Sequence, residues 1–315
     1  MLANDQRPTT YTYLVSGPLT IVGLGELLWD LFPSGRQLGG APANFAYCSH
    51  LLGETGIVVS RVGADEMCND IRESLAAFGL TDDFLQRDDE HATGTVRVKL
   101  DKDGQPDFTI TYPSAWDFLQ SNPALDKLAR SADAVSFGSL AQRSPESRKS
   151  IGRFIELLRP QAAKVFDVNL RQSFYSAEVL AESIARATIV KLNQDEVPKV
   201  AALLDLPGGD VRAYCHETLQ RFRLPLICVT LGDRGSLLVS ADEEHEHAGY
   251  RVKVRDAVGA GDAFTAGLVN QLLHGASLAE ANDLANRMGA WVASSSGAMP
   301  PAPEGGLLAA LAELG

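Results

Sequence analysis

The sequence predicts an α/β fold in which helices cover both faces of a mainly parallel sheet, with a small antiparallel β element attached. The main sheet is predicted by short apolar runs that recur along the 315 residues and by the helical stretches that separate most of them. The small β element is predicted by residues 93–112, where polar and apolar side chains alternate on either side of Asp103-Gly104. This pattern is a strong hairpin signal.

Each element of the main sheet follows from a local pattern. A buried first strand is expected at 20–25, and a helix that packs after it at 42–52. Further strands are expected at 56–62, 134–138, 164–168, 188–192, 226–231 and 236–240. Helices are expected at 144–158, 177–187, 195–204 and 211–222. Because these short apolar strands alternate with helices, we expect a mainly parallel sheet that binds ligands beyond the carboxyl ends of its strands.

Residues 26–38 have the pattern of a second short hairpin, with a Pro-Ser-Gly turn at its centre. We expect it to pair with the hairpin at 93–112, so that the two together form a small lid over the strand ends. No long linker or internal repeat divides the chain, and we expect residues 1–315 to form a single domain. The acidic, histidine-containing run at 243–247 is interpreted as a solvated turn.

The composition is that of a soluble globular protein, with 45% hydrophobic residues and a formal net charge of −12. This charge argues against nucleic acid or an anionic membrane as a partner. It does not exclude small phosphorylated ligands, which respond to local dipoles, cations and a metal ion. The N-terminal residues lack the pattern of a signal peptide and no run reaches transmembrane length, so we expect a cytoplasmic protein.

The most informative motif lies at 256–267, where small residues lead into an amphipathic helix that Gly275 is placed to end. The helix is expected to begin at about 259–262, and its first N–H groups can bind an anion where the side chains are small. The small residues in question are Gly259, Ala260 and Gly261. Asp262 is either a helix cap or a general base beside a bound phosphate, and the motif alone favours the cap.

Two further segments are candidates for contacts with a polar ligand. Gly39 and Gly40, followed by Asn44, either form an ordinary turn that leads into a helix or let the backbone approach a ligand closely. Asp30, which stands between large apolar residues, is either a solvated strand acid or an acceptor for two adjacent hydroxyl groups. Sugars present such hydroxyl pairs.

Polar residues also follow three of the buried strands. The segment 167–171 lies where an open α/β sheet places its ligand contacts. Asn193 and Glu196 either form a capping box or hold a magnesium–phosphate assembly through water. The segment 230–235 is either a hairpin turn or a nucleotide-phosphate loop. The absence of GxxxxGK[ST] excludes a Walker-type cradle, and the absence of a full GxGxxG after the first strand argues against a Rossmann dehydrogenase.

Taken together and in order, these motifs resemble those of the ribokinase (PfkB) family of carbohydrate kinases, and the likeness covers almost the whole chain. The segment 39–44 is similar to the N-terminal signature of the family, 256–262 to its C-terminal signature, and 193–196 to its N-x-x-E motif. Within the family, the runs at 25–33 and 137–140 look most like those of bacterial fructokinases.

The resemblance implies a ribokinase-like, Rossmann-type core with a β lid, ATP as phosphoryl donor, Mg²⁺, and a sugar held between lid and core. It makes Asp262 the catalytic base and 259–261 the anion hole. The sugar contacts it implies are Asp30, Gly39, Gly40, Asn44 and Arg171. The nucleotide contacts it implies are Asn193, Thr230, Gly232, Gly235 and Asn286. The metal ligands it implies are Glu196 for Mg²⁺, through water, and Asp256, Val258 and the segment 294–297 for a monovalent cation such as K⁺.

The expected reaction is transfer of the γ-phosphate of ATP to D-fructose, which gives fructose 6-phosphate. Two alternatives remain open. The first is a kinase with the same catalytic residues that acts on 2-keto-3-deoxygluconate, ribose or another small sugar. The second is a non-catalytic protein on the same fold that senses a sugar or a nucleotide. Because lid strands often pair between subunits in this family, we also expect a homodimer.

Overall fold

The computed structural model describes residues 17–33, 35–100 and 106–314, and within them the core is a nine-stranded sheet. Its strands are β1 (Thr20–Leu24), β4 (Thr55–Gly63), β5 (Leu85–Asp88), β8 (Ala134–Gly138), β9 (Ala163–Asp167), β10 (Ile189–Asn193), β11 (Leu226–Thr230), β12 (Ser236–Ser240) and β13 (Glu244–His247). The strand order is β13-β12-β11-β10-β9-β8-β1-β4-β5. Neighbours from β5 to β11 are parallel, and β12 and β13 extend the sheet in antiparallel fashion.

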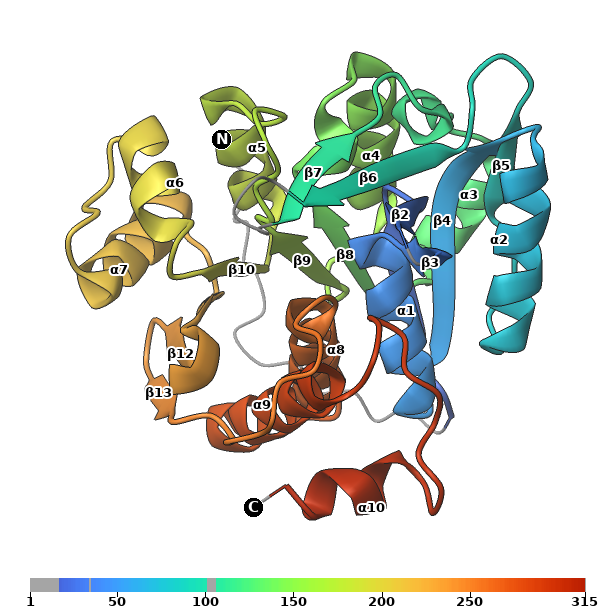
Figure 1. Cartoon of the computed structure of the whole chain (residues 1–315). Coiled ribbons are helices and arrows are strands. Elements are labelled where there is room, and N and C mark those ends of the chain that lie inside the picture. Colours follow the sequence, from blue (N-terminus) through green and yellow to red (C-terminus); the bar gives the residue numbers. More distant parts are fainter. Residues whose placement is uncertain (1–16, 34, 101–105, 315) are drawn as a thin grey trace.

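Helices cover both faces of this sheet (Figure 1). One face packs against α1 (Ala41–Leu51), α2 (Glu66–Ala77), α8 (Ala260–Leu273) and α9 (Leu278–Ser294). The other face packs against α3 (Pro123–Ser131), α4 (Pro145–Leu157), α5 (Ala177–Arg186), α6 (Val197–Leu204) and α7 (Val211–Phe222). The remaining helical segments are η1 (Ala115–Phe118), η2 (Leu140–Gln142), η3 (Gly232–Arg234) and α10 (Leu307–Ala312). The predicted α/β core is confirmed.

The helix ends follow from local chemistry. At the start of α9, the Ser277 hydroxyl accepts from the Glu280 amide while the Glu280 carboxylate accepts from the Ser277 amide, which forms a capping box. At the end of α8, Gly275 has a φ of 77° and its amide donates to the Leu272 carbonyl, as its predicted role as a helix stop requires.

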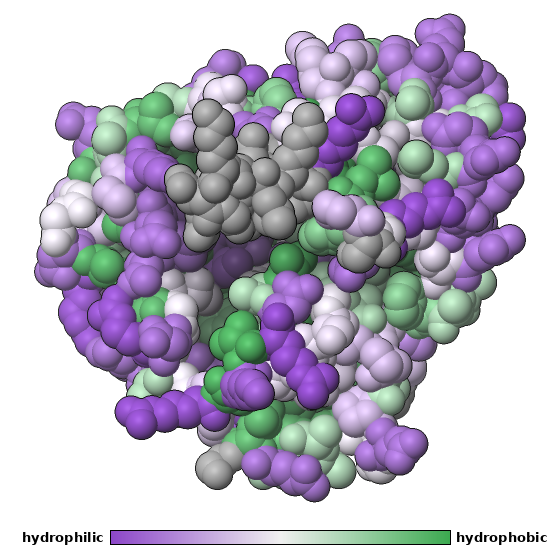
Figure 2. Space-filling view, viewed as in Figure 1, coloured by the Kyte–Doolittle hydropathy of each residue, from purple (hydrophilic) through white to green (hydrophobic). Residues whose placement is uncertain are grey.

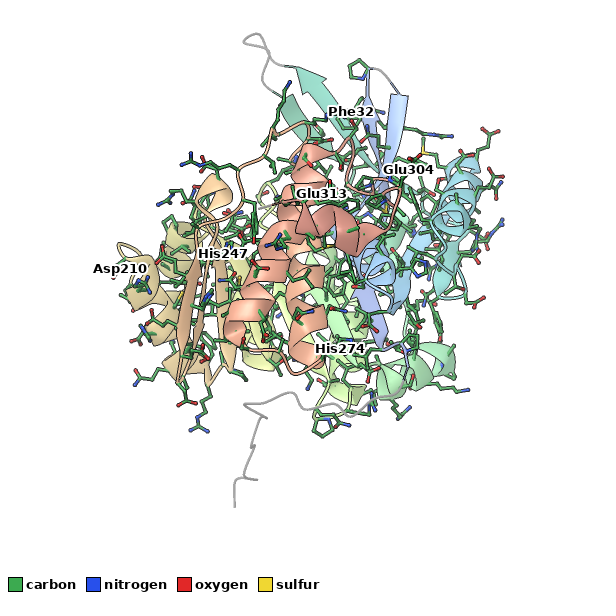
Figure 3. The ribbon with its side chains drawn as sticks, turned by 90° about the horizontal axis from the view of Figure 1, so that it is seen from below. Phe32, Asp210, His247, His274, Glu304 and Glu313 are labelled. Carbon is green, nitrogen blue, oxygen red and sulfur yellow. The ribbon has the colours of Figure 1, made fainter. Side chains whose placement is uncertain are left out.

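A second, four-stranded sheet lies beside the core within the described residues. Its strands are β2 (Leu28–Phe32), β3 (Gly35–Gly39), β6 (Gly94–Leu100) and β7 (Pro106–Ile110). Both predicted hairpins are present, and a parallel pair between β2 and β6 joins them, so that the order is β3-β2-β6-β7. Their tips, at Ser34 and at Asp103-Gly104, lie outside the described residues. The sheet projects from one end of the molecule, where Phe32 is labelled in Figure 3.

The run at 243–247, expected to be a solvated turn, instead contains the edge strand β13. Its side chains contact the neighbouring helix, because Arg212 of α7 forms an ion pair with Glu244 and the ring of His216 forms a hydrogen bond with the same carboxylate. Cross-strand pairing with β12 therefore outweighs the polar character of the run. None of the helices in the described ranges has the length and apolar character needed to cross a membrane.

Candidate active site

A cavity of about 900 Å³ lies between the second sheet and the carboxyl ends of the parallel strands. Residues at the ends of β9, β10 and β11 and at the starts of α1 and α8 line its polar side, and β2, β6 and β7 line the opposite wall. Figure 2 shows a hollow with a hydrophilic floor near the middle of this face of the molecule. This position agrees with the ligand site expected for an open α/β sheet.

The structure brings most of the predicted site residues together around this cavity. Those that line it are Asp30, Gly40, Asn44, Arg171, Asn193, Thr230, Asp256, Val258, Gly259, Gly261 and Asp262. Those that lie outside its lining are Gly39, Ala260, Glu196, Gly232, Gly235 and Asn286. Segments that are far apart in the sequence therefore meet at one place, as their similarity to ordered family motifs implies.

Asp262 lies in the first turn of α8, where the side chain of Asn44 donates a hydrogen bond of 2.7 Å to its Oδ2 atom. Removal from water, together with the nearby carboxylate of Asp167, raises the pKa of Asp262 to about 6. Lys191, the Asn44 hydrogen bond and Arg171 act in the opposite direction. Asp262 is thus held in a fixed position with a pKa suited to accepting a proton near neutral pH.

The start of α8 is shaped by glycines. Gly259 has a φ of 80°, and a Cβ atom there would come within 2.6 Å of the Cβ of Ala298. A Cβ at Gly261 would come within 2.9 Å of the Nζ of Lys191. Among the residues that the structure describes, the amides of Gly261 and Asp262 have no backbone acceptor. The helix therefore presents free N–H groups where only small residues fit.

A buried ion pair that we did not predict lies beside this helix start. The Nζ of Lys191 on β10 donates to the carboxylate of Asp167 at the end of β9, with distances of 2.9 and 3.2 Å. Burial lowers the pKa of Lys191, but the charges of Asp167, Asp262 and Glu196 outweigh it and raise the pKa overall. A lysine in an otherwise apolar strand was the available signal, because a buried lysine needs a partner.

Asn193 and Glu196 form the capping-box arrangement. The two carboxylate oxygens of Glu196 accept from the amides of Leu170 (2.7 Å) and Asn193 (2.8 Å). The side chain of Asn193 accepts from the amides of Asp195 and Glu196 in return. Both oxygens of Glu196 are thus engaged by amides, as the capping-box alternative requires, and a role of Glu196 at Mg²⁺ stays a prediction.

Asp30 faces the cavity from β2, and burial raises its pKa to about 6. Arg171 lowers this pKa and Asp256 raises it further, so the three charged side chains lie near one another. The adjacent glycines are required by close packing. A Cβ at Gly39 would overlap the carboxylate of Asp30, and a Cβ at Gly40 would come within 2.5 Å of the backbone carbonyl oxygen of Glu26.

Three of the residues that the family resemblance assigns to the nucleotide have structural contacts outside the cavity. Gly232 and Gly235 form the turn between β11 and β12, and a Cβ at Gly235 would overlap the backbone of β13. Asn286 on α9 donates to the hydroxyl of Ser236 at 2.8 Å and to Asn282, and thereby ties α9 to β12. Thr230, at the end of β11, lines the cavity.

The segments assigned to a monovalent cation lie side by side. Oδ1 of Asp256 accepts from the amide of Val258 at 3.0 Å, and Oδ2 accepts from the amide of Gly297 at 3.3 Å. These contacts bring the loop before α8 against the 294–297 segment. Carboxylate and backbone oxygen atoms are the type of ligand that such hard cations take.

Comparison with known proteins places the chain in a family. Residues 34–305 match the model of the pfkB family carbohydrate kinases. The chain belongs to this family. It is 32% identical to the fructokinase of Escherichia coli over 298 residues, which cover 89% of this chain and 95% of that protein. It is 30% identical to the aminoimidazole riboside kinase of Salmonella typhimurium over 300 residues, which cover 89% of this chain and 91% of that one.

Solved structures agree with this assignment. The fructokinase of Vibrio cholerae, bound to fructose, ADP and calcium, matches with a TM-score of 0.78 and 26% identity over 94% of this chain and 98% of that one. A sugar kinase from Pyrococcus horikoshii in complex with ATP matches with a TM-score of 0.76 and 26% identity over 93% of this chain and 99% of that one. The chain is therefore a phosphotransferase that acts on a sugar hydroxyl.

Proposed function

We propose that the chain transfers the γ-phosphoryl group of ATP to the primary hydroxyl of D-fructose and forms fructose 6-phosphate. The observation that carries the proposal is the position of Asp262. Its carboxylate, with a pKa raised to about 6, stands in the same helix turn as amides that have no backbone acceptor. A base and an anion site are thereby held side by side, as phosphoryl transfer to a hydroxyl group requires.

In this mechanism Asp262 accepts the proton of the sugar hydroxyl while the hydroxyl oxygen attacks the γ-phosphorus. Asn44 engages Oδ2, which leaves the second carboxylate oxygen to take the proton. The amides of Gly261 and Asp262, at the end of the proposed 259–261 anion hole, stabilise the charge on the transferred group, and the buried ammonium group of Lys191 adds a positive charge beside them. Phosphoryl transfer depends mainly on such positioning and electrostatic stabilisation.

The γ-phosphate of ATP would lie at the start of α8, where a side chain at position 261 would come against Lys191. Glu196 would hold Mg²⁺ through water, with Asn193 and Thr230 facing the nucleotide from the ends of β10 and β11. Mg²⁺ bound with ATP neutralises phosphate charge. The contacts of Asp256 with Val258 and with the 294–297 segment support a place for K⁺ beside the anion hole.

We propose that residues 1–315 work as one kinase domain in which the second sheet, from 26–38 and 93–112, is the lid. Its strands place apolar side chains on the wall of the cavity opposite the base. These are Leu28, Phe32, Val96 and Ile110. Closure over the sugar would exclude water, which otherwise competes with the sugar as phosphoryl acceptor.

Fructose as the substrate is supported by the relatives. The similar proteins include fructokinases from Escherichia coli, Salmonella typhimurium and Klebsiella pneumoniae. The similarity to an aminoimidazole riboside kinase supports the alternative of a substrate other than fructose. Ribose and 2-keto-3-deoxygluconate are the small sugars considered for that alternative. A sensor without activity is less consistent with Asp262 and the buried Lys191, because a site that only binds needs no base.

Product formation tests the proposal. The protein is incubated with magnesium–ATP and a panel of D-fructose, ribose, 2-keto-3-deoxygluconate and aminoimidazole riboside, and phosphorylated sugars are detected by phosphorus NMR. We expect fructose 6-phosphate with the highest kcat/KM. Preference for another sugar would select that alternative, and no phosphorylation of any sugar that binds would favour the sensor.

We also propose that the chain forms a homodimer through its lid. Within the described residues, β3 and β7 are the edges of the second sheet, and such edges offer unpaired backbone groups to another strand. Light scattering of the purified protein should give the mass of a dimer, and a monomer mass at micromolar concentration would contradict this.

A further inference from the structure

Glu26 is a buried acid in the cavity; it lies in the fructokinase-like run 25–33, and the sequence patterns assign it no role. It follows β1, its side chain is only 3% exposed, and it lines the cavity beside Asn44 and Asp262. Its Oε2 atom is buried and has no hydrogen-bond partner among the described residues. A buried carboxylate oxygen without a partner is costly, so its presence in a ligand cavity needs a reason.

The described surroundings of Glu26 provide no hydrogen-bond partner for its Oε2 atom. The backbone amides of Glu26 itself and of Ala41, the first residue of α1, lie near the carboxyl group and lower its pKa. Neither amide is bonded to Oε2. The charged groups that act on Glu26 are Asp262 on α8 and Arg171 after β9. Burial raises its pKa to about 7, so the carboxyl can donate or accept a hydrogen bond at neutral pH.

A second acceptor without a partner among the described residues belongs to Asn44, which also lines the cavity. The Oδ1 atom of Asn44 is also buried without a partner in the part of the chain that the structure describes, while its Nδ2 is engaged by Asp262. Two acceptors without partners in one cavity match a ligand with several hydroxyl groups better than they match a single water molecule.

We propose that Oε2 of Glu26 binds a sugar hydroxyl other than the one that is phosphorylated, and that Glu26 thereby determines which sugars the site accepts. The inference rests on the proposed sugar kinase function. It adds a contact on the base side of the cavity, where Asp262 takes the proton of the reacting hydroxyl, to those of Asp30 and Arg171.

The test compares fructose with analogues that each lack one hydroxyl group: 1-deoxy-, 3-deoxy- and 4-deoxy-D-fructose, and 2,5-anhydro-D-mannitol, which lacks the hydroxyl at C2. Both kcat/KM and the dissociation constant without nucleotide are measured for the wild type and for Glu26→Ala. One analogue lacks the hydroxyl that binds Oε2. For this analogue, kcat/KM of the wild type should be roughly 10-fold or more lower than for fructose. In Glu26→Ala, the kcat/KM values for this analogue and for fructose should differ by less than about 2-fold, because the variant no longer makes the contact.

Two further variants separate recognition from folding. Glu26→Gln keeps the shape and one acceptor and should retain selectivity that Glu26→Ala loses. Glu54→Gln removes a buried carboxylate whose oxygens are bonded to Leu19, Asn270 and His274. His274 is at the end of the molecule opposite Phe32 (Figure 3), so this variant should change thermal stability and leave the analogue ratios unchanged.

The outcomes are distinct. An analogue penalty that disappears in Glu26→Ala supports the contact. Identical analogue ratios in the folded wild-type and Glu26→Ala proteins, for every analogue, would overturn it. If the wild type binds sugars but phosphorylates none, the proposed kinase function fails, and the dissociation constants still decide the role of Glu26.

Discussion

Two buried glutamates of this chain have opposite surroundings. Glu54, at the amino end of the sheet, accepts from the Leu19 amide (2.6 Å), from Asn270 (2.9 Å) and from the ring of His274 (2.7 Å). Glu26, at the carboxyl end, has one oxygen atom without a partner and a pKa raised to about 7. A glutamate side chain thus stabilises the fold at one end of the sheet, and another glutamate remains available to a ligand at the other end.

Other polar side chains at the carboxyl end of the sheet are also buried without full compensation. The pKa values of Asp30 and Asp262 are both raised to about 6, mainly by burial, and Asn44 has an unused oxygen. Groups that are poorly satisfied in the free protein are the ones that a ligand can satisfy, at some cost in stability. The following predictions test whether the two ends separate function from stability in this way.

The largest effect is expected for Asp262→Asn. Loss of the base should lower kcat by about 10²–10⁴-fold, while the affinities for fructose and ATP stay similar, because the amide keeps the shape of the side chain. Steady-state kinetics and calorimetry measure both quantities. Asp210→Asn is the matched control, because Asp210 also stands at a helix start and caps α7 (labelled in Figure 3). If both variants keep near-normal turnover, Asp262 is not the base.

Gly261→Val is expected to have the next largest effect. A Cβ atom there already comes within 2.9 Å of the Nζ of Lys191, and the branched side chain would occupy the anion site. Misplacement of the phosphate should lower kcat/KM for magnesium–ATP by roughly 10²-fold and leave fructose affinity unchanged. Gly209→Val is the control, since no atom lies within 4 Å of a Cβ at that position. Equal activity of the two variants would place the phosphate elsewhere.

Glu54→Gln should affect stability alone. Leaving one or more of its buried partners without an acceptor should lower the free energy of unfolding by about 1–3 kcal/mol. Chemical denaturation measures this change, and kcat and KM should remain within about 2-fold of the wild type. A clear loss of activity in the folded variant would show that the two ends of the sheet are not separate.

Much of the fold could be predicted because its signals are local. The strand at 134–138, the helix at 211–222 and the end of α8 at Gly275 lie where the residue patterns place them. The motifs at 256–262 and 39–44 meet in one cavity, because both lie at helix starts beside the carboxyl ends of strands. Local chemistry and chain direction are enough for these features.

The rest depends on which elements pack together. Glu26 and Lys191 looked like ordinary residues of strand segments, and their roles follow from Asp262, Asp167 and Ala41, which come from other parts of the chain. In the same way, the contacts of Asn286 with β12 and the pairing of β13 with its neighbours depend on tertiary packing. One-dimensional patterns do not contain that information.

The pH dependence of kcat/KM tests the central claim, that Asp262 is a base held near its working pH, most directly. Since the base works in its ionised form, the rate should rise about tenfold per pH unit up to the pKa of about 6 and then level off. This rise below pH 6 should persist in Asp30→Asn, although the pKa of Asp30 is also about 6. The rise should be absent in Asp262→Asn. A profile that is flat between pH 5 and 7 in the wild type, or a rise that persists in Asp262→Asn, would contradict the assignment.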